Sequence, residues 1–206
     1  MDEQILQSLL KWPDVADCFG WLALDRRGRW RMRNEFAQIN NLSGSVIDHT
    51  LLSDYIARNY ACDHLGRYFF QNGAQRVFIA LDATPWIVRI HHTQEMMQMR
   101  TQCASVFEPN SALSDEFGNI YIVGLVNTST LANSIPASFI QKTEISVALL
   151  HDHDLGLFTE GAKVKTQACS FSGSWIWRGQ ELAIEPIQSI ELGKRFRFIQ
   201  DPKRSP

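Results

Sequence analysis

The sequence lacks the short motifs that most often identify an enzyme. It contains no G-x-S-x-G nucleophile motif and neither of the phosphate-binding loops G-x-G-x-x-G and G-x-x-x-x-G-K. Its cysteines are widely separated, so no C-x-x-C pair indicates a structural zinc site. These absences favour a non-enzymatic protein, and we expect neither a cofactor nor a resident metal. The cysteines are Cys18, Cys62, Cys103 and Cys169.

Long apolar runs are absent as well. No stretch reaches the length of about 18 apolar residues that a transmembrane helix needs, and the start, MDEQILQSLLKWPD, lacks the pattern of a secretory signal. We therefore expect a cytoplasmic protein with reduced thiols and no membrane partner. The chain has 20 Lys and Arg against 22 Asp and Glu. This balance argues against a protein that coats nucleic acid, but it leaves a local basic patch open.

Three segments share the pattern Asp-x-x-Gly followed by an aromatic strand. Asp suits the first position of a type I turn, where its carboxylate accepts backbone N–H groups, and Gly suits the fourth, where φ is often positive. Each segment is predicted to form a hairpin with a bulge at the glycine, and three copies indicate internal duplication. A fourth copy in LLHDHDLGLF or GSWIWRGQ is an open alternative. The three turns run from Asp25 to Gly28, from Asp63 to Gly66 and from Asp115 to Gly118.

The strands after these turns alternate. In the first, Trp30 and Met32 point to one face, and the arginines point to the other. This pattern is typical of an antiparallel sheet with one face on a core and one in water. We therefore expect Trp30 in the core and a solvated face that carries Arg29, Arg31 and Arg33.

Helices are predicted at two places. Apolar spacing predicts a helix at residues 48–59, with Ser45 or Asp48 as its N-cap. A second helix is predicted to start at the tripeptide SIP, residues 134–136, because proline suits a first helical turn.

Together these elements predict an α+β fold of repeated antiparallel β-hairpin modules with short helices. The runs RVFIALD and WIVRIHH are predicted strands, and residues 93–106 are expected to lead into a second part of the chain. We expect two related halves. Residues 1–92 would form a hairpin-helix-hairpin half, and residues 93–206 a β-rich half.

Two motifs carry a resemblance to known families. The runs G-W-L-A-L-D-R-R-G-R-W-R-M-R and G-R-Y-F-F-Q-N-G-A-Q-R-V resemble an uncharacterised proteobacterial family of unknown function, well over residues 12–92 and more loosely through VALLHDHDL and RFRFIQDP. A more distant uncharacterised family has a similar order of a D-G-x-W hairpin, a short helix, a G-R-Y strand and a D-x-P-[FW] strand. That resemblance implies a two-part α+β fold of repeated hairpins and a role in signalling. Neither family implies catalytic residues.

The arginine-rich stretch is the first candidate site. Guanidinium groups bind phosphates and carboxylates bidentately, so Arg29, Arg31 and Arg33 are candidate ligand-binding residues. The alternative is a solvated strand face whose arginines pair with Asp14, Asp17 or Glu35. The leading hypothesis is a non-enzymatic binding or regulatory module, which recognises a protein partner or a small anionic ligand on this face or between the halves. Nucleic-acid binding through the strand is an alternative, carried by Arg26, Arg27, Arg29, Arg31 and Arg33.

The run HDHD, residues 151–154, is the second candidate. Imidazole and carboxylate are good ligands for divalent metals. A metal-assisted enzyme is therefore an alternative function, with His151, His153 and Asp154 as ligands and with His91 or His92 completing the site. The spacing also suits an ordinary solvated turn.

Overall fold

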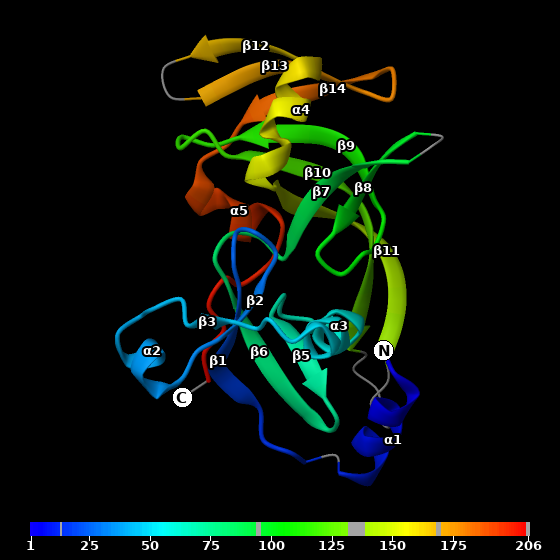
Figure 1. Ribbon diagram of the computed structural model, residues 1–206, viewed down its shortest axis with the longest axis vertical. Coiled ribbons are helices and arrows are strands. Elements are labelled where there is room, and N and C mark those ends of the chain that lie inside the picture. Colours follow the sequence, from blue (N-terminus) through cyan, green and yellow to red (C-terminus); the bar gives the residue numbers. More distant parts are fainter. Residues whose placement is uncertain (13, 94–95, 132–138, 168–169, 205–206) are drawn as a thin grey trace.

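A computed structural model describes residues 1–206 except 13, 94–95, 132–138, 168–169 and 205–206. It is an α+β protein in which a single, strongly curled sheet carries short helices at its periphery (Figure 1). The lower part of Figure 1 contains the N-terminal strands and three helices, and the upper part contains the later strands. The helical elements are α1 (Glu3–Lys11), α2 (Glu35–Ile39), α3 (Thr50–Arg58), η1 (Asp152–Asp154), α4 (Leu155–Gly161), η2 (Ser189–Glu191) and α5 (Leu192–Arg195).

The strands of the described residues follow one path with a branch. The path runs β12-β13-β14-β9-β10-β4-β5-β6-β1-β2-β3, and β11 pairs with both β10 and β7, which in turn pairs with β8. Their bounds are β1 (Cys18–Leu24), β2 (Trp30–Met32), β3 (Ser45–Val46), β4 (Tyr60–Cys62), β5 (Tyr68–Asn72), β6 (Gln75–Leu81), β7 (Trp86–His92), β8 (Met97–Thr101), β9 (Phe107–Ser114), β10 (Ile120–Leu131), β11 (Phe139–Leu150), β12 (Ala162–Gln167), β13 (Ser170–Trp177) and β14 (Gln180–Pro186).

The long antiparallel pair β10–β11 joins the lower and upper parts. Thr130 near the end of β10 pairs with Cys62 of β4, which connects the pair to the N-terminal strands. At the other end, Ala148 of β11 pairs with Trp86 of β7. The predicted strands RVFIALD and WIVRIHH are confirmed as β6 and β7. Strand β7, however, pairs with strands that follow it in the chain rather than with β6.

The three Asp-x-x-Gly turns are present and share one geometry. In each, the Asp N–H donates to the carbonyl four residues on, at 3.0–3.2 Å, and the Gly N–H donates back to the Asp carbonyl. One carboxylate oxygen also accepts two backbone N–H groups, as in Asp25, which accepts from Arg27 and Arg29. The glycine φ values are +74°, +76° and +78° for Gly28, Gly66 and Gly118. This is the predicted type I turn with a bulge.

A fourth turn of the same geometry lies where the sequence pattern does not predict it. Thr101 takes the place of the aspartate, since its N–H donates to the Ser105 carbonyl and its hydroxyl accepts the Cys103 N–H. Ala104 takes the place of the glycine, with a φ of +59°. The two segments proposed as fourth copies differ, because LLHDHDLGLF leads into η1 and α4 and GSWIWRGQ forms a tight two-residue turn after β13.

The helix predictions need two corrections. Helix α3 confirms the predicted helix, but its N-cap is His49, whose Nδ1 accepts the Leu52 N–H at 3.3 Å, rather than Ser45 or Asp48. The predicted helix start at residues 134–136 lies outside the described residues. The expectation that this helix continues beyond residue 138 is wrong, because residues 139–150 form β11, whose residues 139–149 pair with β10.

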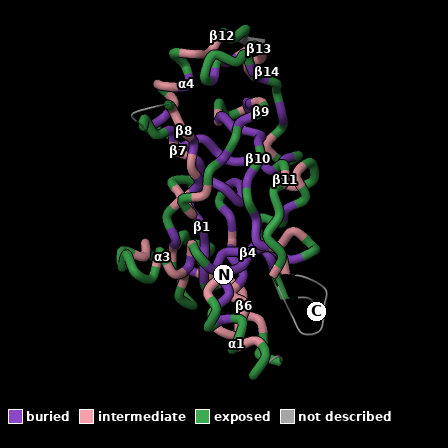
Figure 2. The backbone as a smooth tube through the Cα atoms, turned by 90° about the vertical axis from the view of Figure 1, so that its right-hand side faces the viewer, coloured by how far each residue is buried: buried purple, intermediate pink, exposed green. Residues whose placement is uncertain are grey.

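The core runs along the length of the molecule, as the buried stretch in Figure 2 shows. Trp30 is 4% exposed and meets Tyr60 edge-on, which confirms its predicted core position. Met32 shares that face of β2 but is 45% exposed. None of the described helices is both long and apolar enough to cross a membrane.

The C-terminal segment returns to the lower part after α5 (Figure 1). The Ile199 N–H donates to the Gly66 carbonyl at 3.0 Å, and the Gln200 carbonyl accepts the Leu81 N–H at 2.7 Å. Phe198, which precedes them in the chain, is buried. Residues 196–200 therefore attach the C-terminal segment to the β4–β5 turn and to the end of β6.

Candidate functional site

A cavity of about 670 Å³, which we name the central pocket, lies where the two parts of the molecule meet. One wall is the β4–β5 turn, another is β10 and β11, and the third is the C-terminal segment after α5. The cavity volume is in the range of ordinary small-molecule sites, which span about 300–1,000 Å³. Its lining includes Cys62, Asp63, His64, Gly66, Tyr68, Val123, Thr130, Lys142, Glu144, Ile145, Ser146, Arg195, Phe196 and Arg197.

Cationic side chains outnumber free carboxylates around this pocket. Lys142 lies 2.6 Å from Glu144, and this hydrogen bond raises the pKa of Lys142. Arg195 pairs at 3.5 Å with Glu185, a partner outside the lining. No carboxylate among the described residues lies within ion-pair distance of Arg197. The pocket therefore offers positive charge that the surrounding chain does not neutralise.

The floor of the central pocket offers neutral hydrogen-bonding groups. Burial raises the pKa of the Tyr68 hydroxyl well above its usual range, so this group is a phenol at neutral pH. Burial also raises the pKa of the Cys62 thiol, although the hydrogen bond with Thr130 opposes the change. The Asp63 carboxylate forms an ion pair with Arg67, with Oδ2 2.7 Å from Nε. This chemistry suits binding an anion rather than activating a nucleophile.

The predicted arginine site is well ordered by contacts within the chain. Arg29 and Arg31 both pair with Asp25, at 2.8 and 3.2 Å, and Arg31 also donates to the Gly44 carbonyl at 2.6 Å. Arg33 donates to the Leu42 carbonyl at 3.1 Å.

The acidic partners of the stretch differ from those expected. They are Asp25 and, for Arg27, Asp152 rather than Asp14, Asp17 or Glu35. Asp17 pairs instead with Arg76 at 2.7 Å.

The pKa of Asp25 gives a test of this pairing. Burial raises it, but hydrogen bonds from Arg29, Arg27 and Arg31 outweigh burial and hold the pKa of Asp25 below its usual value. A lowered folded pKa means that the carboxylate stabilises the fold above the unfolded pKa of about 4, and that this contribution is lost as pH falls through the folded pKa. We expect Asp25→Asn to lower the free energy of unfolding at about pH 7 and to approach wild type at about pH 3. Urea unfolding measures both, with exposed Asp54→Asn as control. A deficit of equal size at the two pH values would contradict the pairing.

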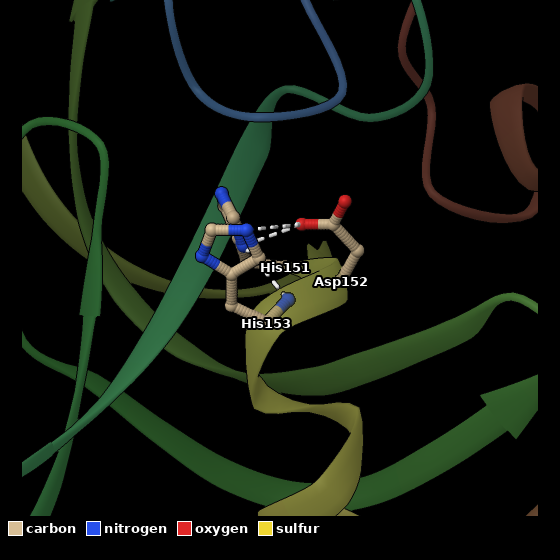
Figure 3. Close-up of side chains that lie close together, drawn as sticks. All are labelled: His151, Asp152 and His153. Carbon is tan, nitrogen blue, oxygen red and sulfur yellow. Dashed lines mark hydrogen bonds and ion pairs between the residues drawn. The ribbon is translucent and has the colours of Figure 1, made fainter.

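Three residues of the HDHD run lie close together, but they include Asp152 in place of the predicted Asp154. His151, Asp152 and His153 place their ligand atoms within 4.8 Å of one another (Figure 3). Asp154 is not part of this group, because its buried carboxylate binds Arg89 at 2.7 and 3.1 Å and accepts the Ile90 N–H.

The additional histidine ligands are not brought to this group either. His91 and His92 are exposed on β7, and His92 lines another cavity, of about 400 Å³, together with Trp175 and Trp177. Among the described residues the cluster therefore consists of three consecutive side chains.

Sequence reasoning missed the residues of the central pocket. Lys142 lies in the segment predicted as a helix. The strand that places Lys142 beside Glu144 was therefore not expected from the sequence. Arg195 and Arg197 flank Phe196 in the run GKRFRF, a concentration of basic residues that would have been a usable signal.

The chain was compared with curated proteins, solved structures and protein-family models. No curated protein gives a significant match. A solved structure of a DUF1285 family protein from Silicibacter pomeroyi DSS-3 is 12% identical and aligns over 85% of this chain and 82% of that one, with a TM-score of 0.41. The model of the DUF2944 family, described as "Protein of unknown function (DUF2946)", matches residues 1–203. The chain therefore belongs to the DUF2944 family.

Proposed function

We propose that this protein is a non-enzymatic regulatory module that binds a small anionic ligand in the central pocket. The observation that carries the proposal is Arg197, which lines this cavity and has no carboxylate within ion-pair distance among the described residues. Guanidinium groups bind phosphate or carboxylate through two parallel hydrogen bonds. Lys142 and Arg195 line the same pocket and add positive charge.

The floor supports the same ligand class. Ser146, Thr130 and Tyr68 supply hydroxyl groups that hydrogen-bond to a ligand without adding negative charge. An anion held by Arg197 would contact segments from both proposed halves, residues 1–92 and 93–206. Ligand binding would then stabilise the contact between these two proposed halves, which is how we expect a regulatory signal to arise.

The test is binding of inorganic phosphate and of phosphorylated and carboxylated metabolites, by calorimetry and by the shift in melting temperature. Arg197→Asn removes the charge and suits the left-handed backbone at this position, where φ is +55°. We expect at least about tenfold weaker binding in this variant, equal to about 1.4 kcal/mol. The matched control is Arg33→Gln, which removes a half-buried arginine from the arginine-rich stretch.

Two outcomes of the variant comparison would overturn the proposal, and a third would come from the melting experiment. One is the same Kd in Arg197→Asn as in wild type. The other is binding that is lost in Arg33→Gln and kept in Arg197→Asn, because it would place the ligand on the arginine strand. A protein that melts at the same temperature with every anion tested would also reject the central pocket, since a ligand at about 100 times its Kd adds about 2.7 kcal/mol.

A further inference from the structure

We propose that His151, Asp152 and His153 form a binding site for a divalent transition-metal ion, separate from the central pocket. The site would use one nitrogen from each imidazole and one carboxylate oxygen. Imidazole nitrogens favour zinc, nickel, cobalt and copper, whereas magnesium and calcium prefer sites built from oxygen alone. The proposal therefore concerns borderline metals and predicts no response to magnesium.

The distances fit a shared ion with little rearrangement. His151 Nδ1 lies 2.8 Å from Asp152 Oδ1, and His153 Nε2 lies 4.0 Å from the same oxygen. With bonds of about 2.1 Å, neighbouring ligands of an ion lie about 3 Å apart and opposite ligands about 4.2 Å apart. The first pair is thus already at the separation of neighbouring ligands. His153 is 64% exposed, so its imidazole can rotate toward the ion without disturbing packing.

His151 Nδ1 and Asp152 Oδ1 are already in direct contact. The His153 backbone N–H lies 3.1 Å from His151 Nδ1, where it can donate to the neutral nitrogen. Asp152 Oδ1 lies 2.8 Å from the same nitrogen, the distance of an N–H···O hydrogen bond when Nδ1 carries the proton. A metal ion bound to both atoms would take the place of that proton, because a ligating imidazole nitrogen must be deprotonated.

Neighbouring groups already orient two of the three ligands. The His151 side chain is buried, with the residue 6% exposed, and the His151 backbone N–H donates to the Val88 carbonyl at 3.0 Å, which anchors the start of η1 to β7. The other oxygen of Asp152, Oδ2, accepts from Arg27 at 2.7 and 3.1 Å. Such a partner fixes the carboxylate and leaves Oδ1 directed at the imidazoles, as Figure 3 shows. Arg27 belongs to the Asp25 turn, so the ion would also link that turn to η1.

The test is metal binding to the full chain without an affinity tag, by calorimetry with Zn²⁺ and Ni²⁺ and by the visible absorption of bound Co²⁺. We expect one ion per chain and at least about tenfold weaker binding in His153→Ala, because one of three protein ligands is lost. The Asp152→Asn variant should weaken binding similarly. The His153 side chain is 64% exposed, so His153→Ala should leave the melting temperature of the metal-free protein unchanged. Asp152→Asn also removes the charge that pairs with Arg27, so each variant is compared with its own metal-free form.

His91→Ala is the matched control, because it removes an exposed histidine from β7 and should leave the affinity unchanged. Equal affinity in wild type and His153→Ala would overturn the proposal, as would affinity lost in His91→Ala alone. An added magnesium ion that competes with cobalt would exclude the ligand set proposed here.

Discussion

Replacing Asp115 with alanine is expected to lower the free energy of unfolding by about 3–5 kcal/mol, because it removes a buried carboxylate that several donors share. Asp115 is fully buried. One oxygen accepts the N–H groups of Phe117 and Asn119 at 3.0 and 2.8 Å. The other accepts the Asn119 amide at 2.6 Å and the Tyr121 hydroxyl at 2.9 Å.

The large effect follows from what the substitution leaves behind. Burial, together with the hydrogen bond to Asp115, raises the pKa of the Tyr121 hydroxyl, so that hydroxyl stays protonated and needs an acceptor. Tyr121 is 2% exposed, and water does not readily replace the lost oxygen. Each buried donor left without a partner costs about 1–3 kcal/mol.

Urea unfolding followed by tryptophan fluorescence measures this prediction. The control is Asp54→Ala on the exposed side of α3, where a change of less than about 0.5 kcal/mol is expected. If Asp115→Ala and Asp54→Ala unfolded at the same urea concentration, the carboxylate would not be the organising group of the turn.

These turns were predictable because their chemistry is local. An aspartate and a glycine three residues apart contain both the acceptor and the positive φ that the turn needs. The turn at Thr101 has the same hydrogen bonds, but a hydroxyl and Ala104 replace the two diagnostic residues. Strand β11 was missed for a different reason. Its last five residues, 146–150, are all buried, so they lack the alternation by which a half-exposed strand is recognised.

The candidate sites were less predictable than the fold because they depend on long-range contacts. The central pocket combines segments near residues 62–68, 123–146 and 195–197. These segments are far apart in the chain, so no sequence pattern indicates that they come together. In the HDHD run, the two aspartates look equivalent in the sequence. Arg89 distinguishes them by binding Asp154, and Arg89 lies on β7, far away in the chain.

Replacing Gly66 with alanine is expected to destabilise the protein by about 2–5 kcal/mol, since strain and a steric clash add. The φ of Gly66 is +76°, and an added Cβ would lie 2.0 Å from the Arg197 carbonyl oxygen. That oxygen belongs to the C-terminal segment, whose Ile199 N–H also donates to Gly66. The segment would have to move away from the β4–β5 turn, because backbone cannot overlap at this distance.

Gly118→Ala is a matched control for this effect. Gly118 occupies the equivalent position of another Asp-x-x-Gly turn with a φ of +78°, but an added Cβ would meet nothing within 4 Å. Gly118→Ala should therefore show the backbone cost alone, about 1–2 kcal/mol. The excess in Gly66→Ala measures the contact with the C-terminal segment, and equal losses in the two variants would show that this contact contributes nothing.

The same pair of variants distinguishes displacement of the C-terminal segment from a general loss of stability. Displacement of the segment in Gly66→Ala should expose the Leu81 N–H, which donates to Gln200, and hydrogen exchange at that amide should accelerate. It should also carry Arg197 away from the central pocket and weaken phosphate binding by at least about tenfold. Gly118→Ala should leave both properties unchanged. If phosphate bound equally well to both variants while the Leu81 amide lost protection only in Gly66→Ala, Arg197 would not be a ligand-binding residue.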